Sequence, residues 1–180
     1  SSAAAFARLH DYHRAAESRD CLGNVFYLRC QLAAAMSEYT NAQRSWRQLA
    51  DPQAQIATMN SMGSVQHMLG ELDTARDTFD DVVKRASQIG FHRFEAWGKE
   101  GLATVERDLG RLENAITLYT VAIHEAQEAD DPQLIMEATY GLAMCYRERG
   151  EYARARALLD HGLRSAVQSE GLFEQVRFRI

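Results

Sequence analysis

The chain has 180 residues, a formal net charge of −5, 46% hydrophobic residues and 25% charged residues. This length is sufficient for one domain with a full core, and the composition is that of an ordinary globular protein. The negative charge argues against a surface that binds nucleic acid directly, because such surfaces are normally basic. No apolar run approaches the roughly 18 residues that a membrane-spanning helix needs, so we expect no membrane partner.

The cysteines and the first residues bear on the cellular setting. Cys21, Cys30 and Cys145 are odd in number and form no Cys-x-x-Cys motif, which argues against a disulfide framework or a zinc site. We therefore expect reduced thiols in a cytoplasmic protein. The chain starts Ser-Ser-Ala-Ala-Ala without a signal segment or an initiator Met, and we expect it to be a fragment or a processed chain.

In chain order, the pattern predicts four helix pairs joined by tight turns. Residues 1–10 fall where the end of a preceding second helix would lie. Asp51-Pro52 and Asp131-Pro132 each give an N-cap followed by proline at the first helical position, which is a strong helix start. The predicted helices span residues 13–29 and 33–49, 52–69 and 73–89, 92–109 and 113–129, and 132–149 and 153–169.

These pairs are internal repeats. Gly70, Gly110 and Gly150 recur at one fixed spacing, and Cys30 replaces the turn glycine of the first unit. Glycine suits the left-handed position that follows a helix. Four columns of apolar or small residues repeat in the same register: Leu22/Met62/Leu102/Leu142, Val25/Val65/Val105/Cys145, Ala35/Ala75/Ala115/Ala155 and Tyr39/Phe79/Tyr119/Leu159.

A fixed period of this kind determines the fold class. We predict an all-α solenoid of antiparallel helix pairs with about eight or nine helices. It would form a single repeat domain over residues 1–180, with units at 13–50, 51–90, 91–130 and 131–171. The small column Gly23/Gly63/Ala103/Ala143 would let paired helices approach closely.

The last segment, residues 172–180, is apolar and stands where a further first helix would begin. Solenoids need polar terminal caps, and none is visible here. We therefore expect the natural array to continue beyond this fragment. An uncapped apolar end also predicts a homodimer through this C-terminal surface.

The columns resemble those of the tetratricopeptide repeat (TPR), which has small and large apolar residues on its first helix and an Ala, aromatic, Ala pattern on its second. The matching residues of the second unit are Met62, Gly63, Ala75, Phe79 and Val82. The resemblance covers nearly the whole chain and implies a right-handed superhelix. The standard repeat has about 34 residues, so the period of 40 lengthens each helix by nearly one turn.

Long-helix versions of this repeat look like the sensor arrays of MalT-like activators, bacterial transcriptional activator domain proteins and Rap-type peptide receptors. The resemblance implies a protein or peptide partner that contacts the first helices on a concave face. Mapping this face onto the chain gives the candidate binding residues Asn24, Tyr27, Asn60, Ser64, His67, Trp97, Glu100, Arg107, Tyr140, Met144 and Arg147. Arginine and aromatic side chains are natural anchors for such partners. The same residues also fit ordinary wet helix faces.

The sequence offers little for catalysis or cofactor binding. His10 and His13 stand close together on one predicted helix face, but no further ligand at metal-site spacing supports them. No Gly-rich phosphate loop and no Gly-x-Ser-x-Gly motif is present. We therefore expect no catalytic residue, no metal and no cofactor.

Two functions follow from these patterns. The first is a non-catalytic protein-interaction module within a larger bacterial signalling or transcriptional regulator. The alternative is a sensor domain that binds a short peptide or a small inducer in the concave groove. Trp97, Arg107, Tyr140 and Arg147 motivate the alternative.

Overall fold

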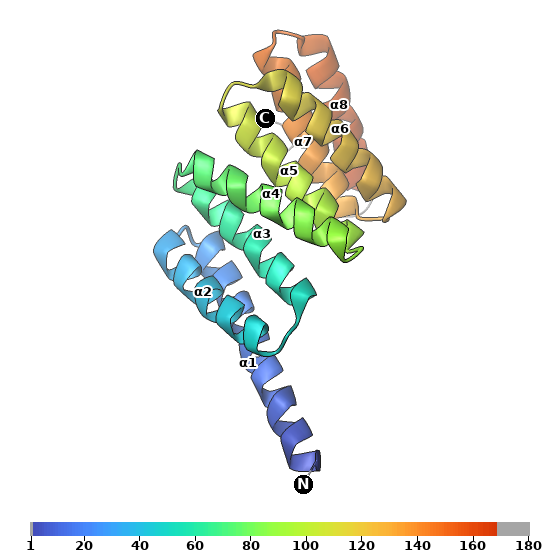
Figure 1. Ribbon diagram of the computed structural model, residues 1–180. Coiled ribbons are helices and arrows are strands. Elements are labelled where there is room, and N and C mark those ends of the chain that lie inside the picture. Colours follow the sequence, from blue (N-terminus) through green and yellow to red (C-terminus); the bar gives the residue numbers. More distant parts are fainter. Residues whose placement is uncertain (1, 169–180) are drawn as a thin grey trace. The chain divides into compact units, whose positions relative to one another are not determined.

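The computed structural model describes the backbone of residues 2–168 and the side chains of residues 11–164. Within this range the chain is all-helical. Successive helices are joined by turns of three residues, and Figure 1 shows them running back and forth as hairpins. The helices are α1 (Ser2–Leu28), α2 (Leu32–Gln48), α3 (Pro52–Met68), α4 (Leu72–Gln88), α5 (His92–Asp108), α6 (Leu112–Glu128), α7 (Pro132–Glu148) and α8 (Tyr152–Gln168).

The predicted helix pairs are thus confirmed, and the ends that the turns define lie within one residue of those predicted. The N-terminal prediction is wrong. Residues 2–10 are not the end of a separate helix but belong to α1, which runs unbroken for 27 residues. The reason is local, because this stretch is rich in alanine and contains no glycine or proline that would end a helix. Residues 172–180 lie outside the described part of the chain.

The turns repeat one backbone geometry. At the end of α3, Gly70 N–H donates to His67 C=O and Glu71 N–H donates to Gln66 C=O, both at 2.9 Å. This is the Schellman pattern, which requires a left-handed residue after the helix. Gly70 meets this requirement with φ of +78°, and Cys30 takes the same conformation with φ of +57°. The prediction that Cys30 stands in for a turn glycine is confirmed.

The two aspartate N-caps are also confirmed. The Asp51 carboxylate accepts a hydrogen bond from Ala54 N–H at 3.0 Å, and the Asp131 carboxylate accepts one from Leu134 N–H at 3.1 Å. Each bond satisfies one of the free donors in the first turn of its helix.

The helices form two compact units. The first comprises residues 1–95 and contains α1, α2, α3 and α4; the second begins at Ala96, inside α5, and contains α6, α7 and α8. In the first unit α2 packs against both α1 and α3, and α3 packs against α4. In the second unit α7 packs against both α6 and α8. The single repeat domain over residues 1–180 stays a prediction.

The repeat columns form the cores of both units. The alanine column is buried throughout, from Ala35 at 0% exposed to Ala155 at 5%. Val65, Val105 and Cys145 are fully buried, whereas Val25 of the same column is 51% exposed. These two columns therefore predict burial correctly except on α1, whereas Met62, Leu102 and Leu159 of the other two columns are half-buried.

Glycines in the first helices make room for the aromatic rings of the second helices. A Cβ atom at Gly23 would lie 2.5 Å from the Tyr39 ring, and one at Gly63 would lie 2.8 Å from the Phe79 ring. In the second unit the ring of Tyr119 lies against α7, where a Cβ at Gly141 would be 2.3 Å from it. The predicted role of the small column Gly23/Gly63 in close helix approach is therefore confirmed.

The left-handed turn residues predict a stabilising substitution. Ala50 has φ of +53°, a conformation that costs a residue with a Cβ roughly 1–2 kcal/mol and glycine almost nothing. Ala50→Gly should therefore raise the midpoint of urea unfolding, as followed by circular dichroism. Ala33→Gly, at an exposed position inside α2, is the matched control and should lower the midpoint. A lower midpoint for Ala50→Gly would contradict the inference that the left-handed backbone at Ala50 is strained.

The contact at Gly141 predicts the opposite result. Alanine favours a helix over glycine by about 1 kcal/mol, but at this position its Cβ would overlap the Tyr119 ring. Gly141→Ala should therefore destabilise the second unit by about 1–3 kcal/mol in the same unfolding assay. Adding Tyr119→Leu should recover part of this loss, since two residues in contact are not additive. If the effects of the two substitutions on the free energy of unfolding are strictly additive, the two side chains are not in contact.

Candidate functional site

The predicted binding residues occupy one face of each first helix. On α3 these are Asn60, Ser64 and His67, and the corresponding positions recur in the same register on the other first helices. A spacing of four and then three residues places side chains on one side of a helix. We call this face the first-helix stripe, and define it as the residues Asn24, Tyr27, Asn60, Ser64, His67, Glu100, Thr104, Arg107, Tyr140, Met144 and Arg147.

In the first unit the second helix holds part of this stripe in place. The Tyr39 hydroxyl of α2 donates a hydrogen bond of 2.7 Å to Asn24 Oδ1 of α1. Burial is the main reason why the pKa of Tyr39 rises to about 12, so this hydroxyl stays protonated and remains a donor. Tyr27, one turn further along α1, packs against the core cluster that contains Tyr39. Asn24 therefore has a fixed orientation before any ligand arrives.

On α3 the stripe contains an unsatisfied acceptor. Ser64 Oγ donates to the main-chain oxygen of Asn60 at 3.2 Å, and both side chains are half-buried. Asn60 Oδ1 is buried and has no hydrogen-bond partner among the described residues. An acceptor in this state costs roughly 1–3 kcal/mol, and because the atom is buried it is not open to a bound ligand. His67, also half-buried, completes the α3 part of the stripe.

In the second unit the stripe forms a connected chain of polar contacts. Thr104 Oγ donates to Glu100 Oε1 at 3.1 Å and lies 2.8 Å from the Tyr119 hydroxyl of α6. Arg107 Nη1 donates to the same hydroxyl at 3.5 Å, while its Nε and Nη2 donate to Asp108 at 3.0 and 2.8 Å. The Arg107 side chain is 18% exposed. These contacts use part of the guanidinium, and the remaining donors can meet another acceptor.

The stripe residues on α7 differ from one another in their exposure to solvent. Tyr140 is half-buried and Arg147 is exposed, but Met144 is 7% exposed and offers little surface to a ligand. Cys145, beside them, is fully buried, and burial raises its pKa to about 11 while the Arg107 charge lowers it. The thiol is therefore protonated at neutral pH and is a poor nucleophile.

Trp97 has a different environment from the rest of the predicted site. Its indole N–H donates to Asp131 Oδ2 at 3.1 Å, while Oδ1 of the same carboxylate accepts the capping bond from Leu134 N–H. The ring also packs against the buried cluster of Ala96 and Leu134. Trp97 thus connects α5 to the start of α7, and its polar atom faces the protein.

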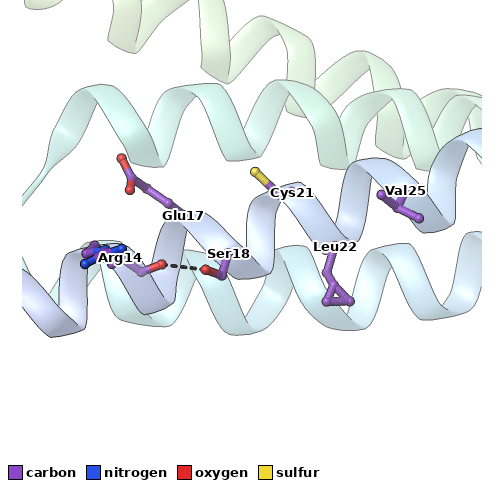
Figure 2. Close-up of a pocket in the computed structure, with 6 residues that line it drawn as sticks. All are labelled: Arg14, Glu17, Ser18, Cys21, Leu22 and Val25. Atoms are coloured by element: carbon purple, nitrogen blue, oxygen red, sulfur yellow. Dashed lines mark hydrogen bonds between the residues drawn. The ribbon is translucent and has the colours of Figure 1, made fainter.

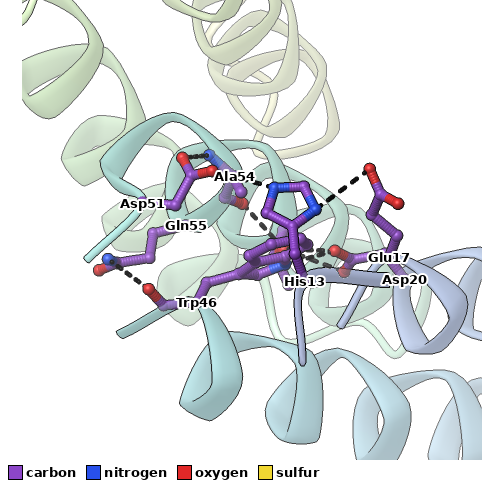
Figure 3. A network of polar contacts seen from close by, with 8 residues as sticks. His13, Glu17, Asp20, Trp46, Asp51, Ala54 and Gln55 are labelled. Atoms are coloured by element: carbon purple, nitrogen blue, oxygen red, sulfur yellow. Dashed lines mark hydrogen bonds and ion pairs between the residues drawn. The ribbon is translucent and has the colours of Figure 1, made fainter. Parts of the chain in front are cut away.

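Asp51 makes the equivalent connection in the first unit. One of its oxygens caps α3, and the other lies 3.7 Å from His13 Nε2 on α1. His13 in turn stacks edge-on against Trp46, with ring centroids 4.9 Å apart (Figure 3). His10, its predicted neighbour in a metal pair, lies outside the described side chains. No group of three or more potential metal ligands occurs among the residues that the structure describes.

Sequence reasoning missed the polar centre of the first unit. Asp20 on α1 accepts a hydrogen bond of 2.6 Å from Trp46 Nε1 on α2 (Figure 3). It also accepts bonds of 2.9 and 3.1 Å from Thr58 Oγ on α3. Burial raises the pKa of Asp20, although both hydrogen bonds lower it. The register places Asp20 on the predicted binding face, one repeat before Asn60, but it does not predict the contacts with Trp46 and Thr58.

Sequence reasoning also missed the hydrogen bonds of two tyrosine hydroxyls, although the spacing of the residues contains a signal for them. Tyr39 lies 15 residues after Asn24, and Tyr119 lies 15 residues after Thr104, so one hydrogen bond recurs in two repeats. In the repeat between them Phe79 has no hydroxyl, and Ser64 bonds to its own helix instead.

One protein family model matches part of the chain. The tetratricopeptide repeat model matches residues 136–161, within α7 and α8. A comparison with curated proteins finds no match. Among the described helices, none is both long and apolar enough to cross a membrane.

Solved structures share the fold. The Rap conjugation gene regulator of the plasmid pLS20, in complex with the Phr* peptide, aligns with a TM-score of 0.86 and 19% identity over 93% of this chain and 46% of that one. A Rap protein complexed with competence and sporulation factor aligns with a TM-score of 0.84 and 18% identity, over 93% of this chain and 47% of that one. This chain therefore spans about half the length of both proteins.

A third match comes from a different biological setting. A kinesin light chain protein of Podosopora anserina with nearly identical TPR-like repeats aligns with a TM-score of 0.67 and 15% identity, over 93% of this chain and 82% of that one. At such identities the likeness shows the fold, and the predicted TPR array is confirmed as an all-α solenoid with TPR-like repeats. Because a gene regulator and a kinesin light chain share this fold, the fold alone does not determine function.

The Asp20 centre predicts a loss of stability. Asp20→Ala removes the acceptor of the buried Trp46 indole and of Thr58, which should cost about 1–3 kcal/mol in the free energy of unfolding. Urea unfolding, followed by the combined fluorescence of Trp46 and Trp97, measures this change in stability. Glu17→Ala, an exposed carboxylate on the same helix, is the control and should change stability by less than about 0.5 kcal/mol. Equal effects of the two variants would contradict a structural role for Asp20.

Proposed function

We propose that this chain is a non-catalytic protein-interaction module that binds a peptide or a peptide-like segment of a protein on its first-helix stripe. The observation that carries the proposal is the polar chain of the second unit. Thr104 and Arg107 of α5 bond to the Tyr119 hydroxyl, and Thr104 also bonds to Glu100. Side chains fixed before binding lose little conformational entropy when a ligand arrives.

The chemistry of the stripe favours a peptide. Main-chain amides and carbonyls of an extended peptide supply donors and acceptors at short intervals, and the stripe offers both kinds of partner. The half-buried Glu100 carboxylate is an acceptor, and Arg107 has guanidinium donors beyond those bonded to Asp108 and Tyr119. Arg147, exposed at the position equivalent to Arg107, adds a cation for an acidic side chain or a terminal carboxylate.

The alternative, a sensor that responds to a short peptide, is favoured by one comparison. The pLS20 regulator was solved with a peptide, and this chain aligns with it over 93% of its own length. We extend the proposal to a module of a bacterial regulator on this likeness. The residues of the stripe are the same whether the ligand is a free peptide or a segment of a partner protein.

The setting proposed for the module is the cytoplasm. All three cysteines are free, which suits a reducing compartment. The net charge of −5 makes direct binding of nucleic acid unfavourable, so a regulatory output would require another domain or partner. The predicted homodimer through the C-terminal end remains part of this proposal.

Peptide selection tests the proposed function. The immobilised chain is used to select from a random peptide library, and the affinity of the selected peptides is then compared among variants. Arg147→Glu should lower the affinity by about tenfold or more, because it reverses a charge on the stripe. The matched control is Arg156→Glu on α8, where Arg156 is 84% exposed and its guanidinium is 3.7 Å from Asp160.

A second variant tests whether binding requires the orientation of the stripe side chains as well as their charge. Tyr119→Phe keeps the ring in its place against Gly141 but removes the hydroxyl that bonds to Thr104 and Arg107. It should weaken binding less than Arg147→Glu and leave the helical content unchanged. Peptides that bind Arg147→Glu and Tyr119→Phe as tightly as the original chain would contradict the proposed stripe.

A further inference from the structure

A second surface lies on α1, beside the stripe. We call it the outer face of α1 and define it as Arg14, Ser18, Cys21, Leu22 and Val25. Together with Glu17 these residues line a hollow of about 450 Å³, and Figure 2 shows the six side chains along one length of the helix. Leu22 is 44% exposed and Val25 is 51% exposed, which is unusual for residues in a repeat column.

The positions of Ser18 and Val25 are buried in other first helices, and the position of Leu22 is half-buried at Met62 and buried at Leu142. At the equivalent positions of α3, Val65 is fully buried and Thr58 is 2% exposed. On α7, the first helix of the last repeat, Cys145 and Ala138 are both fully buried. The repeat therefore builds this face for packing, and α1 carries it without the covering that α3 and α7 have.

The kind of segment that covers the face is seen twice. In the first unit α2 covers α3, with Ala35 and Tyr39 packed against Val65, and Ala42 and Trp46 packed against Ala54. In the second unit α6 covers α7. Tyr119 lies over Gly141 there, and Ala115 and Ala122 share its cluster with Leu142 and Cys145. The covering segment is in both cases an antiparallel helix with an Ala-x3-Tyr-x2-Ala pattern.

The local chain does not supply such a helix to α1. The turns that reverse the chain before α3 and α7 occupy residues 49–51 and 129–131, and the equivalent residues 9–11 are helical within α1. In Figure 1 the first turns of α1 run straight on, past the end of α2. Within the described residues, the reversal that brings a covering helix onto the next first helix is therefore missing at α1.

We propose that the outer face of α1 is a docking site for an amphipathic helix of a partner protein that carries this Ala-x3-Tyr-x2-Ala pattern. The interface continues the observed stacking of α2 on α3. By register, the tyrosine ring enters the hollow beside Cys21, the equivalent of Ser61, whose side chain lies within hydrogen-bonding reach of Tyr39 on α2. The flanking alanines pack on Ser18, Leu22 and Val25.

Arg14 determines the direction in which a docked helix runs. It stands at the position of Ala54 and Leu134, where the C-terminal part of α2 or α6 packs. The docking helix therefore ends near Arg14, and the guanidinium faces the negative end of the helix dipole and its free carbonyls. An antiparallel helix fits this charge, whereas a parallel one would place its positive end there. The outer face is distinct from the first-helix stripe, so either proposal can fail alone.

Two cysteines of the chain allow a direct test. Cys21 lies in the hollow, whereas Cys30 is exposed in the turn after α1 and serves as an internal reference. The probe is a synthetic peptide with the sequence of residues 31–50, and the control peptide carries Tyr39→Glu. At a peptide concentration about ten times the Kd, alkylation of Cys21 in the full chain should slow about tenfold, whereas that of Cys30 should not change.

Matched variants locate the binding site. Leu22→Glu places a charge in the hollow and should abolish protection of Cys21 and peptide binding measured by fluorescence anisotropy. Leu28→Glu changes the same residue type on the same helix, at a position that is 80% exposed and does not line the hollow, and should bind normally. Since both leucines are exposed, neither variant should alter the circular dichroism spectrum.

Two outcomes would overturn the proposal. The first is equal alkylation of Cys21 with and without saturating peptide, or equal binding by Leu22→Glu and the original chain. The second is self-association: if the chain sediments as a dimer that Leu22→Glu dissociates, and Cys21 is protected at high protein concentration without peptide, a second copy covers the face instead of a partner helix.

Discussion

The structure depends on how the aromatic rings of three second helices pack against glycines of first helices. Tyr39 and Phe79 lie against Gly23 and Gly63, and Tyr119 lies against Gly141, at distances that leave no room for a Cβ. Large rings bury much apolar surface, and the absence of a side chain opposite them brings two helix backbones close together. The Schellman turns keep this arrangement in register, because each returns the chain after three residues.

The same aromatic residues link the core to the candidate site. A ring buried between helices places its hydroxyl at the edge of the core, where it bonds to Asn24 in one unit and to Thr104 and Arg107 in the other. The orientation of the stripe is therefore a consequence of core packing. Phe79 breaks this pattern, and the stripe on α3 has instead an acceptor, Asn60 Oδ1, that no described residue satisfies.

The two aspartate N-caps have a comparable double role. One oxygen of Asp131 caps a free amide of α7, and the other receives the Trp97 indole from α5. A tryptophan on the face of a first helix fits a ligand anchor by sequence, but its donor is used within the protein. Asp51 and His13 show the same arrangement in the first unit at a longer distance. The N-caps thus join consecutive first helices as well as starting new ones.

The sequence by itself determined the architecture, because its signals are local and repeated. Apart from the start of α1, evenly spaced turn glycines, two Asp-Pro starts and the alanine column sufficed to place the helices and turns within one residue. The stripe could be predicted only as a list of positions. Its orientation depends on contacts between residues 12 to 15 apart in the chain, such as Tyr119 with Arg107 and Tyr39 with Asn24. The tertiary structure also decided that α1 is continuous and that its outer face is open, since burial depends on which helix packs opposite and not on the column to which a residue belongs.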